Sequence, residues 1–71
     1  MTIEVGRCLI PDLLSQKGWT QRDLSHKTGM SEGLISDYVT KRTIMGVKNA
    51  KSIAVALGCN IDDLYEWVMR D

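Results

Sequence analysis

The sequence predicts one small all-α domain over residues 1–71, compact and built of five short helices. Its 71 residues are too few for more than one domain. An apolar content of 44% beside 25% charged residues is typical of a globular chain and argues against disorder. Apolar residues at helical spacing recur through residues 10–69, which we expect to form the helical core behind an extended segment, residues 1–9.

The N-terminal residues favour an extended chain, because Met1–Leu9 alternates apolar with more polar residues and contains Gly6. Proline is tolerated in the first turn of a helix, where its missing N–H has no helical partner. The first helix is therefore predicted over Pro11–Lys17, ended by Gly18. An alternative starts this helix near Glu4 and kinks it at the proline.

The next two helices have recognisable start and stop signals. Thr20 and Asp23 have the spacing of a capping box, so a second helix should run to about Thr28. Gly29 can supply the left-handed turn that ends it. Ser31 then caps a third helix, predicted over Glu32–Val39.

The C-terminal third predicts two more helices after a basic loop, residues 41–46. Helix four, about Val47–Leu57, has the clearest periodicity, with apolar residues at i, i+3, i+4 and i+7. Asn60 and Asp63 repeat the capping pattern and should open helix five. Its apolar side would comprise Leu64, Trp67 and Val68. Little or no strand is expected.

Two short helices joined by a glycine-containing turn indicate a helix-turn-helix motif over residues 21–40. A small residue, Ser25, allows the two helices to cross closely, and Gly29 reverses the chain without strain. The apolar residues that must then converge on one core are Leu24, Met30, Ile35 and Tyr38.

With these residues the chain resembles the Cro and phage-repressor (Xre-like) family of lambda-repressor-like domains. The resemblance extends from Pro11 to Trp67 and includes Gly18–Leu24, Thr28–Ser31, Leu34–Tyr38 and, less continuously, Ala50–Tyr65. It implies a five-helix DNA-binding domain, with helix three in the major groove, that usually acts as a dimer on operator half-sites.

The resemblance also implies roles by position. Gln21 would brace a phosphate and the recognition helix, exposed positions of helix three would face base edges, and the following residues and the start of helix four would meet the backbone. The predicted DNA-binding residues are Gln21, Arg22, Ser31, Glu32, Gly33, Ser36, Asp37, Thr40, Lys41, Arg42, Lys48 and Asn49.

The helix-three residues predicted to contact DNA bases depart from the family pattern. Helix three offers acids, a glycine and hydroxyls, but no Arg, Lys, Asn or Gln for a bidentate base contact. Glu32 could instead pair with Arg22 or cap its own helix. Most of the affinity should therefore come from Gln21, Lys41, Arg42 and the start of helix four. Trp67 could close the core or, with Leu64 and Val68, form a homodimer seam.

Charge and composition limit the classes of function that the chain could have. The net charge is zero, but the charges are unevenly distributed. Residues 17–51 contain seven basic and three acidic side chains, whereas residues 52–71 contain one basic and four acidic side chains. One histidine and two distant cysteines make no metal site, and nothing predicts catalysis or a cofactor. We expect a cytoplasmic protein, with no membrane association, that acts as a sequence-specific transcriptional regulator on double-stranded DNA, repressor-like and of phage or bacterial type. The alternative is a module of the same fold that binds another regulator.

Overall fold

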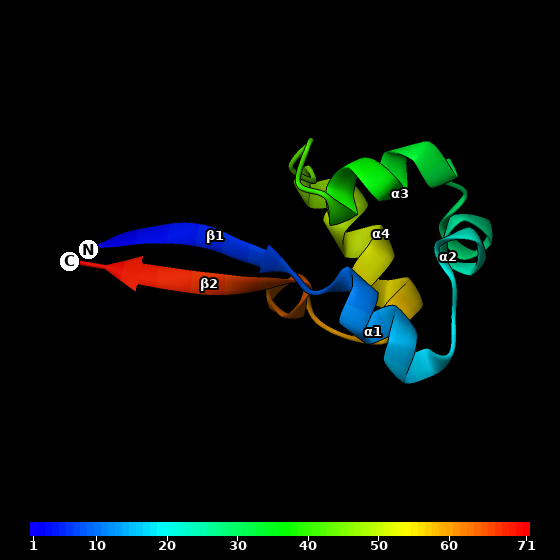
Figure 1. Cartoon of the computed structure of the whole chain (residues 1–71), viewed down its shortest axis with the longest axis horizontal. Coiled ribbons are helices and arrows are strands. Elements are labelled where there is room, and N and C mark those ends of the chain that lie inside the picture. The colour runs from blue at the N-terminus through cyan, green and yellow to red at the C-terminus, as the bar shows by residue number, and fades with distance from the viewer.

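The structure is a computed structural model that describes residues 1–71, and it combines four α-helices with a two-stranded antiparallel sheet. Figure 1 shows the helices gathered in one body, from which the two strands project together as a ribbon. In chain order the elements are β1 (Thr2–Cys8), α1 (Ile10–Lys17), α2 (Gln21–Thr28), α3 (Glu32–Val39), α4 (Val47–Leu57), the 3-10 helix η1 (Ile61–Leu64) and β2 (Tyr65–Arg70).

The domain is mostly helical, as predicted, but the predictions of five helices and of an all-α fold were wrong, because there are four α-helices and the two ends of the chain form a sheet. Helix five is absent: only the four residues of η1 are helical there, and Tyr65–Arg70 is a strand. The extended N-terminal segment is confirmed, but as a strand, which also excludes the helix kinked at Pro11. The physical reason is pairing, because each segment supplies the backbone hydrogen-bond partners that the other needs.

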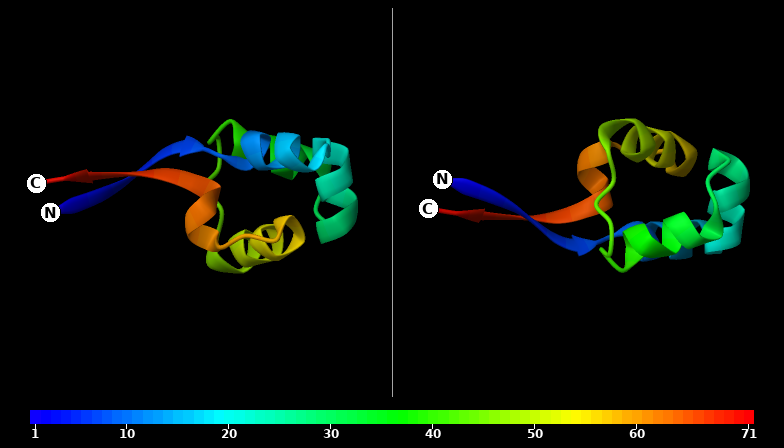
Figure 2. Two further views of the ribbon diagram at one scale, coloured as in Figure 1. Left: turned by 90° about the horizontal axis from the view of Figure 1, so that it is seen from below. Right: turned by 90° about the horizontal axis from the view of Figure 1, so that it is seen from above.

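The ribbon is antiparallel, with Thr2 opposite Arg70 at its outer end and Cys8 opposite Tyr65 at its inner end. A bulge interrupts the register between Val5 and Cys8. Within it, a side chain at Gly6 would put its Cβ 2.9 Å from the carbonyl oxygen of Glu66, so glycine permits this close approach. Figure 2 shows that the two strands twist around each other as they leave the helices.

A single hydrophobic core lies among the helices and the inner end of the ribbon. Its fully buried large side chains are Ile10, Leu24, Ile35, Ile53 and Leu64, so α1, α2, α3, α4 and η1 each contribute one. Burying a side chain of this size stabilises the fold by about 1.5–3 kcal/mol relative to leaving it exposed. The core thus holds the inner face of α3, where Ile35 and Tyr38 are buried, and leaves its outer face free. No helix has the length and apolar character needed to cross a membrane.

Candidate nucleic-acid interface

Side chains next to each helix start cap both helices of the α2–turn–α3 unit. At the start of α2, Asp23 N–H donates to Thr20 Oγ1 and Thr20 N–H donates to Asp23 Oδ2, which confirms the predicted capping box. The backbone hydrogen bond with Thr20 holds the pKa of the Asp23 carboxyl below its usual value. Gly29 ends α2 at φ 77°, and Ser31 caps α3 by accepting from Leu34 N–H. The left-handed Gly29 and the Ser31 cap set the direction in which α3 leaves the turn.

Buried side chains hold α3 against the rest of the domain. Ile35 and Tyr38 face inward, and Leu24 of α2 meets them in the same core. Ser25, the small residue at the helix crossing, donates its hydroxyl to the carbonyl oxygen of Met30. The side chain therefore links α2 to the turn as well as leaving room between the two helices. This is the geometry that the spacing of the apolar residues predicted.

Three of the four α3 residues predicted to contact DNA bases are exposed on the outer face of the helix: Glu32, Gly33 and Ser36. Asp37 is only partly exposed, and its carboxylate lies 4.0 Å from Arg42 Nε. Glu32 and Arg22 are in no ion pair, so the predicted alternative in which they pair is not what the structure shows. The free face of α3 is thus acidic and hydroxyl-bearing.

The residues after α3 form a tight turn with a basic end. Thr40 donates its hydroxyl to the Ser36 carbonyl oxygen at 3.0 Å, which commits this donor to the helix terminus. Lys41 adopts φ 62° and places its Nζ 3.5 Å from the carbonyl oxygen of Val5. Arg42 is largely exposed. The turn therefore presents two cations next to the C-terminal end of α3.

At the start of α4 the two predicted phosphate contacts differ in their surroundings. Lys48 is exposed, whereas Asn49 donates from Nδ2 to the Tyr38 hydroxyl at 2.9 Å. This hydrogen bond ties α4 to the buried tyrosine of α3. Sequence spacing alone did not indicate it, because the two residues lie on different helices.

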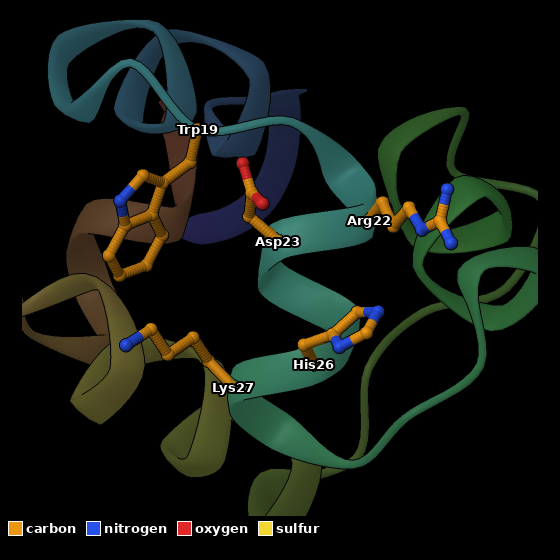
Figure 3. A pocket seen from close by; sticks show the side chains of 5 residues that line it. All are labelled: Trp19, Arg22, Asp23, His26 and Lys27. Carbon is orange, nitrogen blue, oxygen red and sulfur yellow. The ribbon is translucent and has the colours of Figure 1, made fainter.

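A second basic surface lies along α2, in which Gln21 is partly buried and Arg22 is exposed. Lys17 Nζ and Lys27 Nζ lie 5.1 and 5.5 Å from the centre of the Trp19 ring, within cation–π range. Figure 3 shows Trp19, Asp23 and Lys27 on one side of α2 and Arg22 turned away toward α3. Gln21 and Arg22 were predicted to contact DNA, but Lys17 and Lys27 were not, since lysines next to a tryptophan carry no specific spacing signal.

The three residues predicted as a dimer seam do not share a face. Leu64 is completely buried in the core. Trp67 and Val68 are neighbours in β2, so their side chains point to opposite faces of the ribbon.

No three His, Cys, Asp or Glu residues are grouped so that they could hold a metal ion. Both cysteines are free, Cys8 buried and Cys59 partly buried, and burial raises the pKa of each thiol.

Comparison with known proteins identifies the motif. Residues 10–69 match the model of the Cro/C1-type HTH DNA-binding domain. The chain is 44% identical over 66 residues to the SPbeta prophage-derived uncharacterized HTH-type transcriptional regulator YopS of Bacillus subtilis (strain 168), covering 92% of this chain and 89% of the relative. It is 33% identical over 61 residues to YotL, which has the same description and organism, covering 84% and 76%.

A solved structure has the same fold. The crystal structure of the hypothetical transcription factor NHTF from Neisseria superposes with a TM-score of 0.70 at 28% sequence identity, covering 76% of this chain. The match spans 62% of that protein, less than two thirds of its length. The match to the family model covers most of the chain, and the helix-turn-helix lies within it. The chain belongs to the Cro/C1-type helix-turn-helix DNA-binding domain family.

Proposed function

We propose that the protein is a sequence-specific transcriptional regulator, repressor-like and of prophage type, that inserts α3 into the DNA major groove as a homodimer. One observation carries the proposal. The α2–turn–α3 unit leaves the outer face of α3 free and sets the cations Lys41 and Arg42 beside its end, in a chain of a DNA-binding family. The prophage regulators YopS and YotL support the transcriptional role.

The distribution of charge assigns affinity and reading to different residues. Lys41 and Arg42, directly after α3, and Lys48, at the start of α4, are all exposed and would contact phosphates beside the groove. Arg22 and the N-terminal end of α2 would meet the backbone through side-chain and main-chain donors. Most of the binding free energy, and its salt dependence, would come from these contacts.

Recognition of the DNA bases would depend mainly on Glu32 and Ser36. A glutamate accepts from the N4 amino group of cytosine, and a serine hydroxyl both donates and accepts. Asp37 is less available, because its carboxylate is half-buried and near Arg42. We therefore propose that α3 selects cytosine opposite Glu32. Gly33 leaves room for close approach, since nothing lies within 4 Å of the position where a side chain would begin.

Selection from a random duplex library would test sequence specificity directly. The expected result is an enriched motif with two related half-sites, and recovery of unenriched sequence would refute the proposal. On the selected duplex, four to eight phosphate contacts per dimer should give a slope of log affinity against log salt of roughly −4 to −7. Lys41→Ala should reduce the magnitude of that slope by about one for each copy bound. Arg70→Gln, at the far tip of the ribbon, is the matched control and should leave the slope unchanged.

The acidic face of α3 is the one observation that favours a different partner. A basic protein surface could bind Glu32 and Asp37 without any DNA contact. In that case Lys41→Glu with Arg42→Glu would leave regulation intact in a reporter assay. Under the DNA-binding proposal the same double variant abolishes regulation, because two phosphate contacts become repulsive.

A further inference from the structure

The ribbon has one apolar face. Register and strand alternation place four side chains together on it: Ile3 opposite Met69, and Val5 opposite Trp67. Of these, Ile3 is 56% exposed, Met69 67% and Trp67 42%. A shallow hollow of about 310 Å³ lies against this face, lined by Ile3, Trp67, Met69 and Asp62. We call these four side chains the apolar ribbon face; three of them are open to solvent, and Val5 is partly buried against the core.

The opposite face is polar and internally neutralised. Arg70 Nε donates to Glu4 Oε2 at 3.0 Å, and the Thr2 hydroxyl donates to the Arg70 carbonyl oxygen at 3.3 Å. Val68 is the apolar residue on this side. An antiparallel sheet with one apolar and one polar face is typical of a sheet that is covered on one side. The helices do not provide that cover, since the ribbon projects away from them (Figures 1 and 2).

Trp67 is held rigidly enough to act as an anchor for a partner. Its Nε1–H donates to the Asp62 carbonyl oxygen at 2.9 Å, and its ring meets Tyr65 edge to face at a centroid distance of 6.0 Å. These contacts fix the indole while leaving much of its surface exposed. Fixed, partly exposed aromatic side chains are the typical centres of protein interfaces.

We propose that the apolar ribbon face packs against the same face of a second copy of the chain across a twofold axis. The four side chains carry no charge, and the only carboxylate at the rim of the hollow is Asp62. A cation-binding or DNA-binding role is therefore disfavoured, whereas an uncharged patch is compatible with itself. A twofold contact also needs only one patch per chain.

The position of the ribbon favours a second copy over another protein. The ribbon projects from the end of the molecule opposite α2. Two copies that pack through their ribbons would therefore keep α3 uncovered in both (Figure 1). This part of the argument rests on the proposed function, which requires two copies with free recognition helices. A two-stranded ribbon is itself marginal without packing on a face. Dimerisation would thus stabilise the element that forms the interface.

The size of the patch predicts a weak dimer in the absence of DNA. Four side chains from each copy make a contact well below the roughly 800 Å² per partner of a standard stable interface. Self-association should therefore depend on concentration. A duplex with two half-sites would raise the effective concentration of the second copy and favour the dimer.

Sedimentation velocity of the full chain, from low micromolar to several hundred micromolar, is the primary test. The expected result is a concentration-dependent shift from monomer to dimer for the wild type. Met69→Lys should weaken self-association about tenfold or more, because a twofold interface would bury the introduced charge twice. Val68→Lys is the matched control: it adds the same charge one residue away, on the other face and opposite Glu4. It should dimerise like the wild type.

Two results would overturn the inference. One is a wild-type chain that stays monomeric across the whole range, and the other is an equal effect of the two lysine variants. Circular dichroism melting of both variants checks that they fold. If Met69→Lys is unfolded, isotope-filtered NMR on mixed labelled and unlabelled wild type decides, because contacts between Ile3 and Trp67 of different copies are expected and their absence refutes the interface.

DNA binding separates this inference from the proposed function. On a duplex carrying a single selected half-site, Met69→Lys should bind like the wild type, whereas on two half-sites it should lose the gain in affinity. If it keeps that gain, the ribbon interface is wrong while sequence-specific binding stands. If the wild type dimerises but prefers no DNA sequence, the proposed function fails and the interface stands.

Discussion

Replacing Gly29 with alanine perturbs only the turn between α2 and α3. The residue has φ 77°, and no atom lies within 4 Å of the position that an added Cβ would take. Steric collision with the rest of the fold therefore contributes nothing. The left-handed backbone with a Cβ costs about 1–2 kcal/mol. An alanine also restricts the unfolded chain, which offsets roughly 0.4–1 kcal/mol of that loss. The net destabilisation should be on the order of 1 kcal/mol.

Thermal unfolding followed by circular dichroism would measure the effect. A loss of about 1 kcal/mol lowers the Tm of a domain of this size by roughly 4–8 °C. Gly33→Ala is the matched control, because Gly33 lies in α3 without a positive φ and with the same free space around it. Its Tm should be unchanged or slightly raised, since alanine favours a helix more than glycine does.

Equal Tm values for the two alanine variants would refute the reasoning, because the turn would then not require a left-handed residue. A much larger fall for Gly29→Ala would refute it in another way. It would mean that the turn is packed against structure in solution and that conformational preference is the minor cost. The single-site DNA affinity of the folded variant would also report whether the entry angle of α3 depends on this turn.

Three further perturbations test separate parts of the fold. Ile35→Ala empties a fully buried position under α3 and should lower the free energy of unfolding by about 2–5 kcal/mol in urea titration; a loss below about 1 kcal/mol would contradict the described core. Because its hydrogen bond with Thr20 depresses the pKa of Asp23, the carboxylate stabilises the fold above the ordinary aspartate pKa, and this stability is lost as the pH falls toward the folded-state pKa. Asp23→Asn should therefore flatten the acid side of the stability–pH curve, and an unchanged acid side would exclude this origin. Gly6→Ala should speed hydrogen exchange of the ribbon amides more than that of the helices, since the new Cβ would lie 2.9 Å from the Glu66 carbonyl oxygen; equal protection would show that the strands do not approach so closely.

The helical part of the fold was predictable because its signals are local. The capping box at Thr20, the left-handed Gly29 and the periodicity of Val47–Leu57 each act within one or two turns of chain, and the structure confirms all three. The bounds predicted for α3 and α4 are those observed. Such features depend on neighbours in the sequence and not on distant partners.

The C-terminal strand was missed because two periods coexist in it. Leu64, Trp67 and Val68 have helical spacing, whereas alternate residues from Tyr65 to Met69 fit a strand equally well. The deciding interaction is with Thr2–Cys8, about sixty residues away, which no local pattern reveals. The capping contact at Asn60 is present, with its N–H donating to Asp63 Oδ2, but it opens only the short η1.

The candidate site was predictable in outline but not in detail. Exposure of Glu32, Gly33 and Ser36 follows from the helical period of α3. The hydrogen bond from Asn49 to Tyr38 and the approach of Lys41 to Val5 depend on how separate elements pack. Direct contact of any of these residues with DNA stays a prediction.

The meeting of the two chain ends at the ribbon tip has a consequence for folding. Thr2 pairs with Arg70, 68 residues away along the chain, so this contact costs more closure entropy than the local pairings of the helices, and we expect it to form late (Figure 1). During synthesis β1 leaves the ribosome first and stays unpaired until β2 has followed the four helices. A circular permutant that joins Met1 to Asp71 through a short turn would convert this long-range pairing into a local hairpin. Its ribbon should then form faster than in the natural chain, because a short turn costs far less closure entropy.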